Sequence, residues 1–156
     1  MFGFFKKYDA HLCSAVSGQI LLNGKPLVGG KVERGLNYID DKKREDHTLT
    51  DEQGCFTMPA VNVRSKAPGW AFAEQLTMQL IYIEHNNKPY VLWSACLSGT
   101  EPVPAYDKKL KTLQADLSNP EVAFTFINES NPNVPHCVRS VCRWNDDFEI
   151  LHIVKD

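Results

Sequence analysis

The residues of this chain best suited to chemistry are histidines and cysteines that lie close together in the sequence. His136 and Cys137 are adjacent, Cys142 follows them, and His11 is separated from Cys13 by one residue. Imidazole nitrogen and thiolate sulfur are common ligands of zinc, and a thiolate beside a histidine base can act as a nucleophile. Metal binding and thiol catalysis are therefore the two chemistries to weigh.

Neither chemistry has a complete motif. The spacing of these residues matches no compact zinc pattern, which favours packed thiols and surface histidines over a metal site. Neighbouring residues of a strand point to opposite faces, which disfavours a dyad of His136 and Cys137. The sequence has no glycine-rich phosphate loop and no Gly-x-Ser-x-Gly motif. We therefore predict no catalytic residues, no metal and no cofactor; a hydrolase using His136 and Cys137 stays open as an alternative.

Charged and aromatic residues in expected loops are the candidates for binding a partner. Residues 40–46 are all charged and predict a solvated loop tip, and Trp70 follows a Pro-Gly pair. Tryptophan and arginine are enriched at interfaces, although packing caps are an equally good interpretation of both tryptophans in this set. The predicted partner-binding residues are Asp40, Asp41, Arg44, Glu45, Trp70, Arg143 and Trp144.

The composition limits the class of protein. A hydrophobic share of 43% is enough for a packed core, and the net charge of −2 argues against a nucleic-acid partner. No stretch approaches the roughly 20 apolar residues of a membrane-spanning helix. The first residues carry lysines after a very short apolar patch, the reverse of a secretory signal, so we expect a cytoplasmic protein. Five scattered cysteines predict free, mostly buried thiols, and the oligomeric state stays open.

The elements that must position these residues are mainly strands. Alternating apolar residues between turn signals predict an antiparallel sandwich, with a tight turn at Asn23-Gly24 and a core Trp93. The segment 76–83 is apolar on both faces in its latter half, which predicts a central strand covered on both sides. One helix is expected over 106–117, with Lys108, Lys109 and Lys111 on its wet face. Further strands are expected at 16–22, 31–38, 55–59, 90–95 and 122–127.

We expect one domain over residues 1–156 with three parts. The lead-in 1–15 is rich in aromatic rings, namely Phe2, Phe4, Phe5 and Tyr8, which we expect to plug the edge of the domain. Residues 16–61 form the core motif, and 129–156 form a C-terminal extension that ends in a short apolar segment.

The core motif resembles a known domain. Val-Ser-Gly-Gln-Ile-Leu-Leu-Asn-Gly-Lys-Pro-Leu (16–27), Gly-Lys-Val (30–32) and Thr-Asp-Glu-Gln-Gly-Cys-Phe-Thr-Met-Pro (50–59) are similar to the carboxypeptidase-regulatory-like domain. The resemblance implies a transthyretin-like, immunoglobulin-like sandwich of about seven strands with an accessory role. The start of the chain, Phe-x-Lys-Tyr-Asp, and Cys142-Arg143-Trp144 also resemble a bacterial family of which some members are linked to interbacterial toxins and type VI secretion.

These observations predict a protein-binding module without catalysis. The specific form that the resemblance implies is an immunity or accessory protein for a secreted bacterial effector, in a type VI secretion context. An immunity protein needs only a rigid scaffold whose loops cover a toxin. The alternatives are a sandwich that binds a small molecule or a carbohydrate, and the hydrolase named above.

Overall fold

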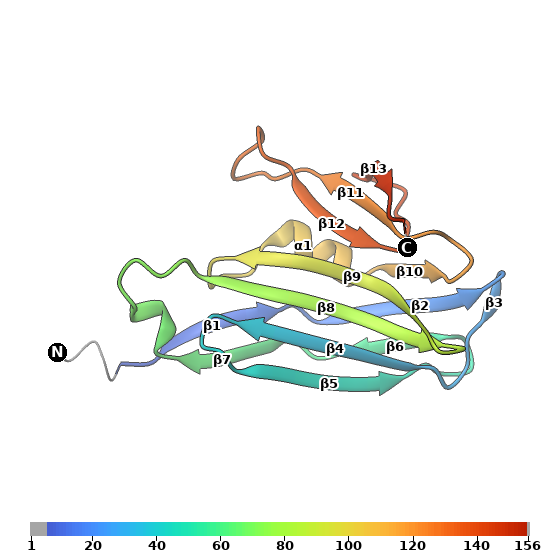
Figure 1. Cartoon of the computed structure of the whole chain (residues 1–156), viewed down its shortest axis with the longest axis horizontal. Coiled ribbons are helices and arrows are strands. Elements are labelled where there is room, and N and C mark those ends of the chain that lie inside the picture. The colour runs from blue at the N-terminus through green and yellow to red at the C-terminus, as the bar shows by residue number, and fades with distance from the viewer. Residues whose placement is uncertain (1–5, 156) are drawn as a thin grey trace.

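Most of the chain lies in β-strands that form two facing layers, as the computed structural model of residues 6–155 shows (Figure 1). The helices are η2 (Ala67–Gly69), of the 3-10 type, and α1 (Pro104–Leu110). The strands are β1 (Tyr8–Cys13), β2 (Val16–Leu22), β3 (Lys25–Pro26), β4 (Lys31–Tyr38), β5 (Lys43–Leu49), β6 (Cys55–Met58), β7 (Val61–Ser65), β8 (Leu76–His85), β9 (Lys88–Ser98), β10 (Leu113–Asp116), β11 (Val122–Phe126), β12 (His136–Ser140) and β13 (Glu149–Ile153).

The larger layer is an antiparallel sheet of seven strands in the order β13-β11-β12-β9-β8-β4-β5. Figure 1 shows β13 at the top of this sheet and β5 at the bottom. The pairing between β8 and β4 runs through seven residue pairs, whereas β12 meets β9 in the ladder only at Arg139 and Ser94. The sheet therefore has a long paired half and a C-terminal half that is joined to it at one short contact.

The smaller layer is built around β2. This strand pairs with β6 and β3 in antiparallel fashion and with β10 in parallel, and β1 and β7 form a separate antiparallel pair. Gly18 of β2 is required there, because a Cβ at this position would lie 2.4 Å from the carbonyl oxygen of Leu113 in β10. The glycine thus permits the close approach of the two backbones.

The core lies between the layers. Alternate side chains of β4, β8 and β9 are buried, and Trp93 is fully buried, as predicted. The amide of Gln79 donates to the carbonyl of Leu12 in the other layer and accepts from the indole Nε1 of Trp93. Both polar groups are thereby satisfied inside the core. The predicted fold class, a mainly antiparallel β-sandwich with one short α-helix, is confirmed for residues 6–155.

The turns of the core motif form as predicted. Asn23 and Gly24 both adopt positive φ, at 52° and 79°, in the tight turn between β2 and β3. The carboxylate of Asp116 accepts hydrogen bonds from the backbone N–H groups of both residues. Bonds from Ser118 and from this turn lower the pKa of Asp116 to about 2. Asp51 likewise accepts from the N–H groups of Gln53 and Cys55 at 2.9 Å.

The predicted helix over 106–117 is wrong in its second half. The helix ends at Leu110, and β10 begins at Leu113. Leu113, Ala115 and Leu117 are buried at a spacing of two, which is the pattern of a strand. Leu113 and Leu117 also fit the spacing of a helix, which is why the sequence pattern predicted one. Lys109 is not on a wet face: it is buried, with only 6% of its surface exposed.

Three further expectations need correction. Of the predicted loop tip 40–46, residues 43–46 belong to β5, because they pair with β4. The segment 76–83 is covered on one face only, and Met78 and Leu80 are exposed on the other, where the sheet meets no further layer of the described residues. The lead-in contains β1, which pairs with β7; Phe2, Phe4 and Phe5 lie outside the described residues. No helix within residues 6–155 is long and apolar enough to cross a membrane.

Candidate binding surface

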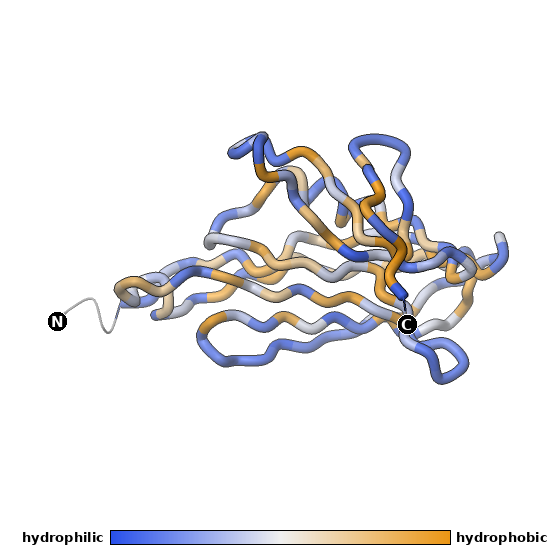
Figure 2. Tube along the Cα trace, turned by 45° about the horizontal axis from the view of Figure 1, so that its top comes forward, coloured by the Kyte–Doolittle hydropathy of each residue, from blue (hydrophilic) through white to orange (hydrophobic). Residues whose placement is uncertain are grey.

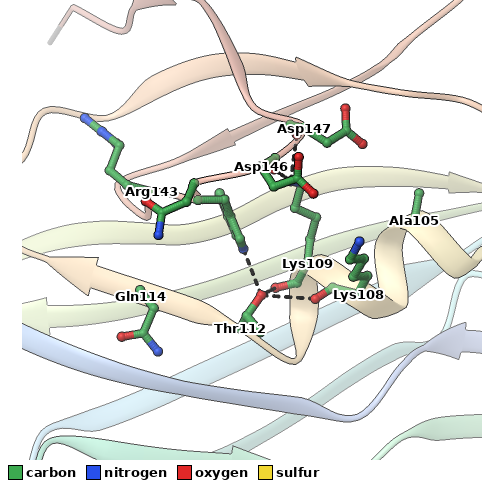
Figure 3. Close-up of a pocket in the computed structure, with 10 residues that line it drawn as sticks. Ala105, Lys108, Lys109, Thr112, Gln114, Arg143, Asp146 and Asp147 are labelled. Atoms are coloured by element: carbon green, nitrogen blue, oxygen red, sulfur yellow. Dashed lines mark hydrogen bonds between the residues drawn. The ribbon is translucent and has the colours of Figure 1, made fainter.

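One group of predicted residues lines a cavity of about 290 Å³ between α1 and the segment 143–147 (Figure 3). It is lined by Arg143 and Trp144 of that segment and by Lys108 and Lys109 of α1. Asp146 and Asp147 complete the wall next to the lysines. The cavity thus lies between the helix and the segment that leads into β13.

Lys109 is the central contact of this cavity. Its ammonium group donates hydrogen bonds to the backbone carbonyls of Asp146 at 2.9 Å and Asp147 at 2.7 Å (Figure 3). It also lies 5.3 Å from the ring centroid of Trp144 and 5.5 Å from that of Phe126. Burial lowers the pKa of Lys109, although the nearby Asp147 and Asp146 oppose this. Lys109 therefore holds the segment 143–147 against the helix.

Arg143 and Trp144 also hold this segment in place. The indole Nε1 of Trp144 donates to the hydroxyl of Thr112 at 3.1 Å, and its ring packs 5.0 Å from the ring of Phe124. The guanidinium of Arg143 donates to the carbonyl of Pro120 at 2.8 Å and to that of Cys142. The polar groups of both residues are thus occupied within the chain, and their contacts position the start of β13.

The other predicted residues lie elsewhere. Asp40, Asp41, Arg44 and Glu45 lie at the turn from β4 into β5, at the opposite edge of the sheet from β13. Arg44 and Asp40 form an ion pair at 2.8 Å, and this hydrogen bond lowers the pKa of Asp40. Trp70 follows η2 and is exposed together with Phe72. The structure therefore divides the predicted set among three places.

Beside β5, the outer face of the sheet carries a groove that the sequence did not indicate. Its volume is about 370 Å³, and Met78 and Leu80 form its apolar wall. It passes over Gly35, where an added Cβ would meet no neighbouring atom within 4 Å, and it extends from Glu45 to Arg139. The missing side chain of Gly35 creates the hollow. This surface was not expected, because the segment 76–83 was predicted to be covered on both faces.

The free edge of β13 is the second surface that the sequence did not indicate. Ile150, Leu151 and Ile153 are all exposed, and in residues 6–155 no other strand pairs with the outer side of β13. The pairing with β11 is irregular at Leu151, because Ile150 faces Phe124 and the next pair is His152 with Ala123. Figure 2 shows hydrophobic stretches in this part of the chain and a mainly hydrophilic β5. The apolar pattern of the segment was visible in the sequence, but its exposure was not.

The candidate thiol and histidine chemistry does not assemble at one site. His136 packs 4.9 Å from the ring of Tyr106, and burial lowers its pKa. Cys137 is exposed, whereas Cys142 is fully buried and burial raises its pKa to about 12. Within residues 6–155, no three His, Cys, Asp or Glu side chains are placed to hold a metal ion. The expectation of mostly buried thiols is wrong for Cys96 and Cys137, which are exposed.

The structure also contains a serine–histidine pair that was not predicted from the sequence. The Nε2 of His11 is 3.1 Å from the hydroxyl of Ser14, and its Nδ1 is 2.7 Å from the side-chain oxygen of Asn62. The Ser14 hydroxyl donates to the carboxylate of Asp107 and is buried. A nucleophile must reach its substrate and pass its proton to the histidine, and this hydroxyl does neither. The network therefore connects β1, β7 and α1.

The comparisons with known proteins give one result. A family described as a domain of unknown function (DUF6795) matches residues 16–120. No curated protein and no solved structure matches the chain. The matched segment begins with β2 and ends just after β10, two strands that pair with each other. The cavity wall at 143–147 and the edge strand β13 lie beyond it.

Proposed function

The chain belongs to this DUF6795 family, and we propose that it is a non-catalytic protein-binding module that takes up an extended segment of another polypeptide along β13. The observation that carries the proposal is the free edge of β13 with three exposed apolar side chains. An edge strand presents unpaired N–H and C=O groups to which a further strand can bond, and the alternate side chains add specificity.

The opposite edge of the sheet supports this assignment. β5 carries charges at four consecutive positions, from Lys43 to Asp46, and charged edges resist strand addition. A second copy could not add its β13 to such an edge, so strand addition at β13 does not continue into a fibre. We assign the β13 edge to a different polypeptide that supplies one extended, partly apolar segment; two-fold pairing with the β13 of a second copy is the competing arrangement that the test below separates from it.

The net charge of −2 favours a protein over a nucleic acid as the partner. A narrower form of the proposal is an immunity or accessory protein for a secreted bacterial effector, in a type VI secretion context. Its support is the sequence resemblance of residues 16–61 to carboxypeptidase-regulatory-like domains, together with the resemblance at 142–144. A cytoplasmic location also stays a prediction.

The test compares two matched substitutions on opposite edges. Leu151→Lys and Leu49→Lys each place a charge at an exposed leucine, 56% exposed on β13 and 60% exposed on β5. Each variant is immobilised and exposed to an extract of host cells, and bound proteins are identified by mass spectrometry. We expect L151K to retain about tenfold less of the partner than the native chain and L49K to retain as much.

Hydrogen exchange then identifies the binding mode. Strand addition should protect the backbone amides of β13 when the identified partner is added, because they acquire hydrogen bonds. Equal capture by both variants, or unprotected β13 amides, would rule out this edge. Concentration-dependent dimerisation of the purified native chain that L151K abolishes would assign the edge to a second copy, and the proposal of a different partner would be wrong.

The groove over Gly35 favours a second candidate function, binding of a small apolar ligand. Its wall is formed by Met78 and Leu80. Arg139 lines one end and suits an anionic group, although its guanidinium also pairs with the carboxylate of Glu121 at 3.7 Å. The probe is 8-anilinonaphthalene-1-sulfonate, and the matched variant is Gly35→Leu, which fills the hollow where there is open space for a side chain. Fluorescence enhancement by the native chain that G35L loses supports this candidate; equal enhancement by both chains contradicts it.

A further inference from the structure

Two cysteines of this chain are exposed, and they lie on neighbouring strands. Of the five free thiols, Cys13 and Cys142 are buried and Cys55 is partly buried, while Cys96 and Cys137 are exposed. Cys96 belongs to β9 and Cys137 to β12, which pair in antiparallel fashion at Ser94 and Arg139. If the register of that pair is continued by two residues, Cys96 comes opposite Cys137, just beyond the end of the ladder.

The side chains of the two cysteines are on the same face of the sheet. Along β9, Ala95 and Leu97 are buried and Cys96 is exposed; along β12, Val138 is buried and Cys137 is exposed. A disulfide accepts Cα atoms about 4.4–6.8 Å apart, a span that facing residues of a regular antiparallel ladder meet, so the bond requires the spacing at Arg139 and Ser94 to extend two residues further. The continued register and the shared exposed face are thus both compatible with a bond between these sulfur atoms.

A cavity of about 300 Å³ connects the two thiols. Cys96 and Cys137 both line it, together with Tyr106, whose hydroxyl donates to the carbonyl of Cys96 at 3.0 Å. Burial raises the pKa of Tyr106 to about 12, and the charges of Cys96 and Cys137 both add to the rise, as expected if both sulfur atoms are near the phenol. The two cysteines thus border one common cavity.

We propose that Cys96 and Cys137 form a reversible cross-strand disulfide, which makes this cavity a site of thiol oxidation. The oxidant is a low-molecular-weight disulfide of the glutathione type. The thiolate of Cys137 attacks one sulfur of the oxidant, which forms a mixed disulfide and releases one thiol. The thiolate of Cys96 then attacks the sulfur of Cys137 and releases the second thiol. The protein loses two electrons and two protons, and the oxidant gains both.

The order of the two steps follows from the surroundings of the thiols. Burial raises the pKa of Cys96, and the carboxylate of Glu74 adds to this. The thiolate is the attacking species, so this shift slows the attack of Cys96 on a free oxidant. Cys96 therefore acts as the resolving thiol, once the mixed disulfide on Cys137 is held at the facing strand.

The bond would change how the C-terminal strands are attached. β12, β11 and β13 join the rest of the sheet through the Arg139–Ser94 pair, a backbone bond from Val141 to Val91, and a bond from the Ser140 hydroxyl to the carbonyl of Leu92. A disulfide two residues beyond the ladder pair would add a covalent link at the end of β12 where the ladder has no further pair. Oxidation should therefore tighten the junction of the two halves of the sheet.

The experiment oxidises the reduced full-length chain with excess glutathione disulfide and maps the disulfides by mass spectrometry of unreduced peptides. We expect a cross-link between the peptides that contain Cys96 and Cys137 as the dominant product. Cys96→Ser should lose the cross-link and retain glutathione on Cys137, and Cys137→Ser should lose it without a stable adduct on Cys96. Cys55→Ser is the matched control and should behave as the native chain.

Separate glutathione adducts on both cysteines of the native chain, a dominant bond to Cys55, or two unreacted thiols would each overturn the proposal. The same oxidation in a denaturant tests the contribution of the fold. There, we expect the preference for the Cys96–Cys137 pair to disappear, because five thiols then compete. An unchanged preference in the unfolded chain would show that the facing strands are not its cause.

Discussion

The two edges of the seven-stranded sheet differ in composition and in how each is attached to the core. β5 is charged along most of its length, and Asp46 points inward from it to the guanidinium of Arg34, which is 1% exposed. β13 is apolar and open to solvent, with Leu151 at an irregular position in its pairing. Charged and inward-pointing residues block an edge against further strands. One edge of this sheet is thus closed by its own side chains, and the other is available.

The attachments of the two edges also differ in kind. Arg34 bonds to the side chain of Asp46 at 2.9 and 2.5 Å. Lys109 bonds instead to the backbone carbonyls of Asp146 and Asp147, just before β13. A main-chain acceptor is present whatever the side chain is. The contact of Lys109 therefore does not depend on which side chains stand at positions 146 and 147, although Arg143 and Trp144 hold the same segment through their own side chains. The contact of Arg34 with β5 requires the carboxylate of Asp46, in addition to the backbone pairing of β5 with β4.

The largest effect is expected when that carboxylate is removed. Asp46→Ala removes the carboxylate from the buried guanidinium of Arg34, which keeps its bonds to the carbonyl of Pro59 and the Sγ of Cys13, and loss of one member of a buried ion pair costs about 3–5 kcal/mol. Because 40% of the Asp46 side chain is exposed, we expect the lower end, about 3 kcal/mol of unfolding free energy in urea denaturation. Glu45→Ala, on the outer face of the same strand, is the control. An unchanged midpoint for D46A would contradict the dependence of β5 on this pair.

A smaller and more local effect is expected at the other edge. Lys109→Met removes both hydrogen bonds to the carbonyls before β13 and should cost about 2 kcal/mol, since bonds to charged groups contribute about 1.5–3 kcal/mol each and relief from burying the charge offsets part of the loss. Hydrogen exchange should accelerate in β13 and stay unchanged in β5. Lys108→Met on the exposed side of the same helix provides the control. Equal acceleration at both edges would refute a local anchor.

The smallest effect concerns pH and the turn into β5. The bond to Arg44 lowers the pKa of Asp40 in the folded chain, so charged Asp40 adds stability above the ordinary aspartate pKa of about 4, and this stability is lost as the pH falls through the lowered value. Asp40→Asn should therefore be less stable than the native chain by about 1 kcal/mol at pH 7.

This difference between D40N and the native chain should shrink in acid, as unfolding curves measured at falling pH would show. Asp41→Asn is the control, because asparagine tolerates the positive φ of 60° at that position. A difference that stays constant down to strongly acidic pH would show that the Arg44–Asp40 pair does not contribute through its charge.

The elements that were predictable from the sequence are those fixed by local geometry. Asn23, Gly24 and Asp51 form their turns through their own backbone preferences and nearby hydrogen bonds, so their types and spacing were sufficient. The stretch 110–117 was not predictable in this way, because Leu110, Leu113 and Leu117 suit both a helix and a strand. The parallel neighbour β2 decides between them, and it lies more than 90 residues away in the chain.

The surfaces were less predictable for a different reason. Whether Met78 or Leu151 is exposed depends on where the layers end, which is a property of the whole fold. The burial of Lys109 likewise follows from the return of residues 146–147 over α1. Sequence spacing reports which side chains share a face, and it does not report whether anything covers that face.

The pairing of β2 with β10 also sets the order in which the chain can fold. Leu117 donates to the carbonyl of Leu21, and 93 residues separate Asn23 from the Asp116 carboxylate that receives its N–H. Contacts between such distant residues require the closure of a long loop, which slows folding. During synthesis, β2 can pair with β6 as soon as residues 55–58 have left the ribosome. Its pairing with β10 must wait until residues 113–117 have also left it. The segment 16–120, which the family matches, is thus complete only when β10 has formed. Until then, β2 has one unpaired side.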